Sequence, residues 1–175
     1  MYKRQHLERL SRVIGKDDIV VIYITGIAYS PEPEGSRVIL LEDDGQITTD
    51  ELRVHTSSLD PKSLFFVFDT CYGGAFSQVV TSDVNDRRIA ISFSDPDHTT
   101  NCSYIVPYFW RALFMYDQAN DLDHDDNVSV REAFLHAVTT YNQRKPSSSP
   151  ILNANRLFRT SGGLNDLILS DGPNR

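Results

Sequence analysis

Residues 64–76 read LFFVFDTCYGGAF, and this stretch decides the fold. Its apolar start is rich in Phe and does not alternate with polar residues, which is typical of a strand buried on both faces of a parallel sheet. Asp69 and Cys71 are therefore expected at the carboxyl end of the strand, where ligand and catalytic groups of open α/β sheets collect. The glycine pair that follows permits a sharp turn. A helix starting near Ala75 would point its amide end at Cys71 and favour the thiolate. The simpler alternative is that Cys71 is only a small buried side chain.

The amino-acid composition limits the class of protein to which this chain can belong. A chain of 175 residues with 40% hydrophobic residues is long enough for one domain with a core. Its net charge of −7 argues against nucleic acid or an anionic membrane as the main partner. No apolar run approaches the roughly 18 residues of a membrane span, and the first residues lack the apolar core of a signal peptide. Cys71 and Cys102 make no disulfide framework, so a reduced, cytoplasmic setting is expected.

The rest of the chain alternates predicted strands with predicted helices, which indicates an α/β fold with a largely parallel sheet. Thr48 followed by Glu51 predicts a capping box at the start of one helix. The last edge strand is expected at either 156–159 or 166–169. The expected helices are 3–14, 49–58, 75–80, 103–116 and 130–142, and the other expected strands are 19–24, 38–41, 63–68 and 87–93.

The strand–Asp-x-Cys-x-Gly–helix pattern around Cys71 resembles the nucleophile segment of the caspase-like cysteine peptidases, a group that includes legumains, metacaspases and bacterial relatives. Strand 19–24 looks like the strand that carries the family's His-Gly pair, so the resemblance extends over most of residues 1–175 as a single domain. It implies a caspase-like three-layer sandwich, a mostly parallel sheet flanked by helices. It also implies Cys71 as nucleophile, a peptide or protein as substrate or ligand, and no cofactor for catalysis.

The chain departs from the family at the position of the catalytic base, where Ile27 stands in place of His. A cysteine peptidase needs a base to take the thiol proton and then protonate the leaving amine, and such groups contribute about 10²–10⁴-fold. We therefore expect little or no peptidase activity unless His98, in the loop after strand 87–93, acts as a substitute base.

The family fold also begins with another strand and helix before the element at 3–14, so the first strand is missing here. In family members that strand lies beside the one matching 19–24. Its absence would leave 19–24 as an exposed apolar edge, which natural proteins avoid because unpaired backbone groups recruit other strands. The expectation is a complementing chain, self-association through this edge, or a truncated reading frame.

Acidic side chains are also expected near the cysteine. Asp95 and Asp97 follow strand 87–93, and related peptidases often use acidic residues there to bind a basic side chain at the cleavage position. Asp69 is a third candidate for substrate binding. The alternative for the Asp-Pro-Asp segment is ordinary turn chemistry.

Residues 121–132, DLDHDDNVSVRE, have the spacing of an EF-hand-type calcium loop. Position 6, where Gly normally makes a sharp turn, is Asp126, a residue type that tolerates left-handed backbone. The spacing predicts one Ca²⁺ of modest affinity in a structural role; the alternative is an acidic turn whose calcium site has decayed. The expected ligands are Asp121, Asp123, Asp125, Asn127, Ser129 and Glu132.

Three functions remain open at this point. The first is a caspase-like domain that keeps Cys71 but has lost its base and serves as a binding or regulatory partner. The second is an active cysteine endopeptidase that uses His98 or a His supplied by a partner. The third is a calcium-binding interaction module unrelated to proteolysis.

Overall fold

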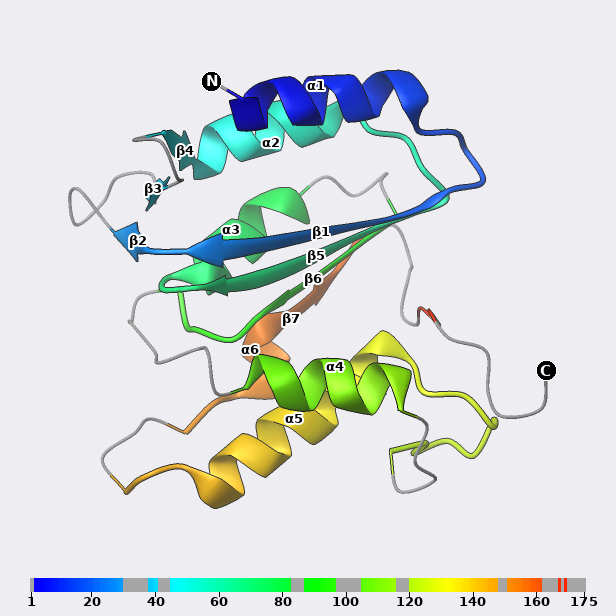
Figure 1. Cartoon of the computed structure of the whole chain (residues 1–175). Coiled ribbons are helices and arrows are strands. Elements are labelled where there is room, and N and C mark those ends of the chain that lie inside the picture. Colours follow the sequence, from blue (N-terminus) through cyan, green and yellow to red (C-terminus); the bar gives the residue numbers. More distant parts are fainter. Residues whose placement is uncertain are drawn as a thin grey trace.

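A four-stranded sheet in the order β1-β5-β6-β7 forms the centre of the computed structural model (Figure 1). The first three strands are parallel and the last is antiparallel to β6, so the expected α/β fold with a mostly parallel sheet is confirmed. The strands are β1 (Ile19–Gly26), β5 (Ser63–Thr70), β6 (Arg88–Ser92) and β7 (Phe158–Thr160). The structure describes residues 2–29, 38–40, 45–82, 87–96, 105–115, 120–147, 151–161, 167 and 169.

Helices cover both faces of this sheet, with α1, α2 and α3 on one side and α4 and α5 on the other (Figure 1). A small antiparallel sheet, β2-β3-β4, lies beside the carboxyl end of β1. Within the described residues, no helix is long and apolar enough to cross a membrane. The helices are α1 (Tyr2–Val13), α2 (Thr49–Ser57), α3 (Gly73–Val80), α4 (Val106–Phe114), α5 (Val130–Arg144) and α6 (Ala154–Leu157); the small strands are β2 (Ala28–Tyr29), β3 (Val38–Leu40) and β4 (Gln46–Thr48).

Strand β5 lies in the interior of the sheet and is buried on both faces, as its unbroken apolar run predicts. Phe65 and Val67 belong to the core beneath α4 and α5. Phe66 and Phe68 point the other way, into the core beneath α2 and α3, where their rings stack with centroids 5.9 Å apart. Because side chains alternate along a strand, this one apolar segment contributes residues to the cores on both faces of the sheet.

Local signals in the sequence account for several element boundaries. The predicted capping box opens α2, where Thr48 Oγ1 accepts from the N–H of Glu51 (3.1 Å) and Glu51 Oε2 accepts from the N–H of Thr48 (3.0 Å). Strand β7 begins at Phe158, so the first of the two predicted tail strands, 156–159, is right in its second half and wrong in its first, which belongs to α6. The second, 166–169, lies largely outside the described residues, and neither Leu167 nor Leu169 is in a strand.

Two predicted helix boundaries are wrong. Helix α3 begins at Gly73 rather than Ala75, because bonds from the next strand's loop hold the glycine amides in helical position. Helix α4 is shorter than predicted and begins at Val106, with Pro107 in its first turn as expected. A proline there loses no hydrogen bond, because the first amides of a helix have no partner within it.

Arg88 is a fully enclosed cation, 2% exposed, at the start of β6. Its Nη1 donates to the carbonyl of Val80 (3.1 Å) and its Nη2 donates to the carbonyl of Thr56 (3.0 Å). Those carbonyls lie at the carboxyl ends of α3 and α2, where helix dipoles concentrate negative charge. One guanidinium thus joins the ends of two helices.

Strand β1 is the edge of the sheet, as expected for residues 19–24. Within the described part of the chain it pairs with β5 and with no other strand. Its apolar side chains are partly exposed on the face toward α4, where Ile19, Val21 and Tyr23 are 41–43% exposed. The side chains of the opposite face, Val20, Ile22 and Ile24, pack against the core cluster that Leu7 and Leu10 of α1 also contact.

Candidate functional site

The register of β1 against β5 brings the position of the predicted base next to Cys71. Thr25 pairs with Asp69 and Gly26 pairs with Thr70, and these are the last paired residues of the two parallel strands. Ile27 and Cys71 each follow directly, at the same edge of the sheet. Cys71 is partly buried and Ile27 is 69% exposed. The residue that follows β1 at this position therefore has an alkyl side chain, which can neither accept nor donate a proton.

The turn after Cys71 is tight, as the glycine pair predicts. Tyr72 adopts the left-handed conformation (φ 55°), which costs energy for a bulky residue and must be held by its surroundings. A Cβ on Gly74 would lie 2.6 Å from Cδ and 2.7 Å from N of Pro96. A Cβ on Gly73 would lie 2.9 Å from Ser92 Oγ. The loop after β6 thus packs directly on the backbone of this turn.

Ser94 is the centre of the hydrogen bonds that hold the turn. Its Oγ accepts from the N–H of Gly73 (2.7 Å) and donates to the carbonyl of Thr70 (2.6 Å). Its own carbonyl accepts from the N–H of Gly74 (3.0 Å) and from Ser92 Oγ (2.6 Å). Sequence analysis named acidic residues in this loop and missed Ser94. The available signal was a serine directly after a buried strand, at the sheet edge that carries Cys71.

The predicted substrate-binding carboxylates are only partly located. Asp69 accepts a hydrogen bond from Tyr23 Oη (2.7 Å), so one of its oxygens is already engaged. Burial, followed by the hydrogen bond and the charge of Asp69, raises the pKa of Tyr23 to about 12. Asp95 is half-buried, next to Pro96 in the chain. Asp97, His98 and Cys102 lie outside the described residues, so their predicted roles stay predictions.

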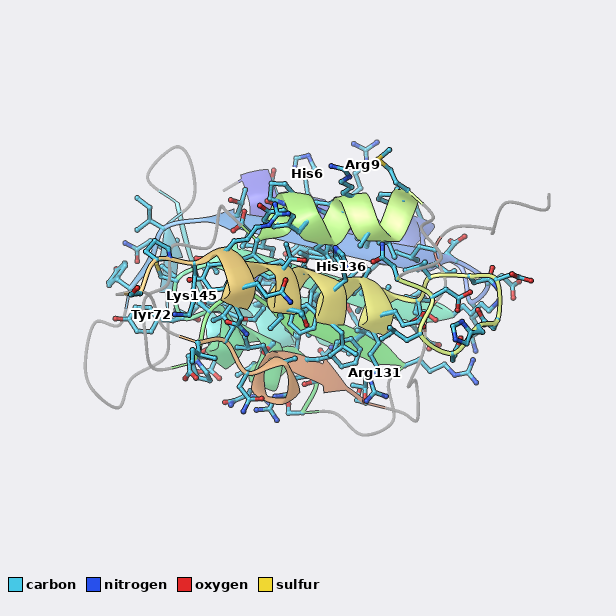
Figure 2. All side chains as sticks on the ribbon, turned by 90° about the horizontal axis from the view of Figure 1, so that it is seen from below. His6, Arg9, Tyr72, Arg131, His136 and Lys145 are labelled. Atoms are coloured by element: carbon cyan, nitrogen blue, oxygen red, sulfur yellow. The ribbon has the colours of Figure 1, made fainter. Side chains whose placement is uncertain are left out.

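The acidic loop lies at the other end of the molecule. Figure 2 shows Tyr72, next to Cys71 in the chain, at one end and Arg131, in the first turn of α5, toward the opposite end. Three carboxylates of the loop come together there. Asp121, Asp123 and Glu132 each offer an oxygen, and these atoms all lie within 4.8 Å of one another.

Backbone amides position the two buried carboxylates of this group. Glu132 forms a capping box with Ser129, because its Oε2 accepts from the N–H of Ser129 (2.8 Å) and its own N–H donates to Ser129 Oγ (3.2 Å). Its Oε1 accepts from the N–H of Leu122 (2.6 Å). Asp121 accepts from the N–H groups of Asp125 (3.1 Å) and Asp126 (3.0 Å). Local hydrogen bonds therefore hold these two carboxylates in place.

The other predicted ligands are not part of this group. Asp125 Oδ1 accepts from the N–H of Asn127 (2.9 Å). The hydroxyl of Ser129 is within 2.9 Å of Glu132 Oε2 and belongs to the helix cap. Asp126 has φ 66°, so an aspartate makes the left-handed turn at the position where such loops usually have glycine. The replacement of Gly therefore leaves the turn intact.

The donor set of the loop fits a hard cation. All three grouped side chains offer carboxylate oxygens, which Ca²⁺ prefers. Asn120, which precedes Asp121, is 4% exposed, and its Oδ1 has no hydrogen-bond partner among the residues that the structure describes. Desolvation in the crowded loop raises the pKa of Asp123, and the charges of Asp125, Glu132 and Asp121 raise it further. A bound cation would neutralise this mutual repulsion.

Neither the models of known protein families nor the curated proteins give a match to this chain. The resemblance to caspase-like peptidases therefore rests on the residues around Cys71 and on the order of the elements.

Proposed function

We propose that this chain is a caspase-like domain in which Cys71 keeps the nucleophile position and Ile27 occupies the position of the lost base. It acts by binding a peptide or protein at the carboxyl edge of the sheet rather than by cleaving it. The observation that supports this proposal is the strand register, since Ile27 and Cys71 follow the last paired residues of β1 and β5.

The chemistry of the site supports binding over cleavage. A cysteine nucleophile is normally activated by an adjacent base, which position 27 does not supply. Even after attack, the leaving amine needs a proton, and neither Ile27 nor the backbone amides of the turn can supply one. The carboxylate of Asp69 accepts a hydrogen bond from Tyr23 Oη, so these two groups already bind each other. The expected loss relative to a complete Cys–His pair is about 10²–10⁴-fold.

The test restores the missing base. The purified chain is expected to leave fluorogenic peptides with a basic residue at the cleavage position uncleaved. Ile27→His should produce cleavage that disappears in the Ile27→His, Cys71→Ala double variant. Ile27→Gln, a polar side chain without a useful pKa, is the matched control and should stay inactive.

Two outcomes would overturn the proposal. Cleavage by the unmodified chain that is lost in Cys71→Ala, together with loss of Cys71 thiol-probe labelling in His98→Ala, would establish an active peptidase. A folded Ile27→His variant with no gain in either cleavage or Cys71 reactivity would contradict the assignment of position 27.

A structural calcium site is the second candidate function, supported by the three carboxylates within 4.8 Å of one another. Ca²⁺ at about 100 times its dissociation constant should stabilise the fold by about 2.7 kcal/mol, seen as a rise in melting temperature. Asp123→Asn should abolish the rise, whereas Asp17→Asn, an exposed aspartate in a turn outside the loop, should leave it unchanged. No rise at millimolar Ca²⁺ would exclude the site.

A further inference from the structure

The open side of β1 is an apolar surface that the proposed function at Cys71 does not use. The strand is eight residues long, Ile19–Gly26, and none of them is charged. Sheet edges are normally protected by charged residues, prolines, bulges or a covering element, because unpaired N–H and C=O groups recruit other strands. Within the described residues β1 has none of these at its free side.

The surface continues from the strand onto α4. Tyr23, 43% exposed, meets Trp110 edge to face with ring centroids 6.1 Å apart. Trp110 stacks on Phe114 with centroids 5.6 Å apart, and Phe114 itself is 58% exposed. Val21 lies on the same face as Tyr23, because side chains alternate along a strand. We call the surface made by Ile19, Val21, Tyr23, Trp110, Phe114 and Met115 the edge strip.

We propose that β1 pairs with β1 of a second copy of this chain, antiparallel about a two-fold axis, so that two sheets join into one and the edge strips meet beneath them. With the axis near Ile22, Tyr23 of each copy lies across from Val21 of the other. Directly opposed residues of an antiparallel pair share a face, so apolar side chains meet apolar side chains from Val20 to Ile24, and Ile19 lies across from Thr25.

The charges that flank the strand select this arrangement. Asp17 and Asp18 precede β1, whereas Gly26 and Ile27 at its other end are uncharged. A parallel partner would set two aspartate pairs side by side, which is destabilising. An antiparallel copy sets each aspartate pair beside the uncharged end instead. The strand therefore suits its own copy in one direction only.

The area of the contact bears on whether two copies can form a stable dimer. Eight residues at about 3.3 Å each extend the pairing over about 26 Å, which is a narrow contact by itself. A stable interface usually buries about 800 Å² per partner, with aromatic residues enriched. The exposed rings of Tyr23 and Phe114 add apolar area on the α4 face of the paired strands, and Met115, which directly follows α4, is 61% exposed.

The first test is the oligomeric state of the full chain, measured by light scattering and sedimentation over a concentration series. The unmodified chain should reach the dimer mass, and more readily at higher salt, since screening weakens the repulsion between two copies of net charge −7. Val21→Lys should remain monomeric at every concentration. Val54→Lys, at an exposed valine on α2, is the matched control and should dimerise normally.

A second measurement keeps the proposal testable if Val21→Lys does not fold. Val21→Cys mixed with Tyr23→Cys should give an oxidised heterodimer, faster than either variant mixed with Val54→Cys. A monomeric unmodified chain at the highest concentration, or a dimer that survives Val21→Lys, would overturn the proposal. So would a monomer that instead binds an added apolar strand peptide at β1, which would assign the edge to a strand from another protein. None of these results depends on whether Cys71 cleaves or binds a peptide.

Discussion

The turn after Cys71 and the acidic loop before α5 both gather polar groups at the end of an element, yet different forces hold them. Around Cys71 the bonds are neutral and buried, with Ser94 donating and accepting at the centre. In the acidic loop, carboxylates accept bonds from backbone amides while their charges repel one another. The first arrangement is complete without a ligand, whereas the second becomes more favourable when a cation binds. Substitutions in each of the two regions test this difference.

The largest loss of stability is expected from Gly74→Ala, which disrupts the close packing at the turn after Cys71. The added Cβ would lie 2.7 Å from the backbone nitrogen of Pro96, so the chain itself must move. Overpacking of this kind costs about 3 kcal/mol of unfolding free energy, measured by urea denaturation. Gly15→Ala is the control, because its Cβ would meet only Asp18 Oδ2 at 3.5 Å. Equal stability of the two variants would show that the turn is not tightly packed.

Ser94→Ala is expected to cost about 2 kcal/mol, because it leaves the buried N–H of Gly73 and carbonyl of Thr70 without their bonds. Ser57→Ala removes an exposed hydroxyl that donates to the carbonyl of Val54 in its own helix, and should cost far less. Urea denaturation of both variants measures the difference. Equal stability of the two variants would show that the hydrogen bonds of Ser94 do not hold the turn after Cys71.

The acidic loop should respond in the opposite direction. Without a bound cation, Asp123→Asn is expected to raise the melting temperature at low salt, because it removes one of several like charges. The gain should shrink as salt is added, since the exposed charges are screened. A lower melting temperature for Asp123→Asn under these conditions would mean that repulsion does not dominate the loop.

The smallest change in stability is expected for Tyr23, and only at alkaline pH. The pKa of Tyr23 is raised from 10.0 to about 12, so the folded chain favours the neutral phenol. The contribution to stability is complete below pH 10 and is lost as pH rises toward 12, because the unfolded chain ionises first. Tyr23→Phe should remove this part of the alkaline decline. Asp69→Asn should lower the pKa of Tyr23, followed by phenolate absorbance; an unchanged absorbance titration would rule out their coupling.

The sequence predicts best those features that depend on neighbours along the chain. The buried character of 64–68 follows from its composition, and the predicted cap at Thr48 involves a residue three positions away. The left-handed turn at Asp126 is likewise a local property. Each of these can be derived from a short window because the interacting groups lie within that window.

Features that depend on contacts between distant segments were missed. Ser94 acts on Gly73, 21 residues away, and Tyr23 donates to Asp69 across 46 residues. A serine after a buried strand and a tyrosine within a strand are both common, so neither local window identifies the distant partner. Spacing alone also does not tell which carboxylates of the acidic loop come together, and in the fold these are Asp121, Asp123 and Glu132. Asp125, whose Oδ1 accepts from the N–H of Asn127, stays a predicted ligand.

Arg88 has a consequence for how the fold opens. Its guanidinium bonds to the last turns of both α2 and α3, and these bonds are buried with the side chain. Neither helix can leave the sheet without exposing a charge that the other helix also holds. Amide protons in the last turns of α2 and α3 should therefore exchange with solvent in one shared opening event, as a cooperative unit whose segments are joined through a single side chain.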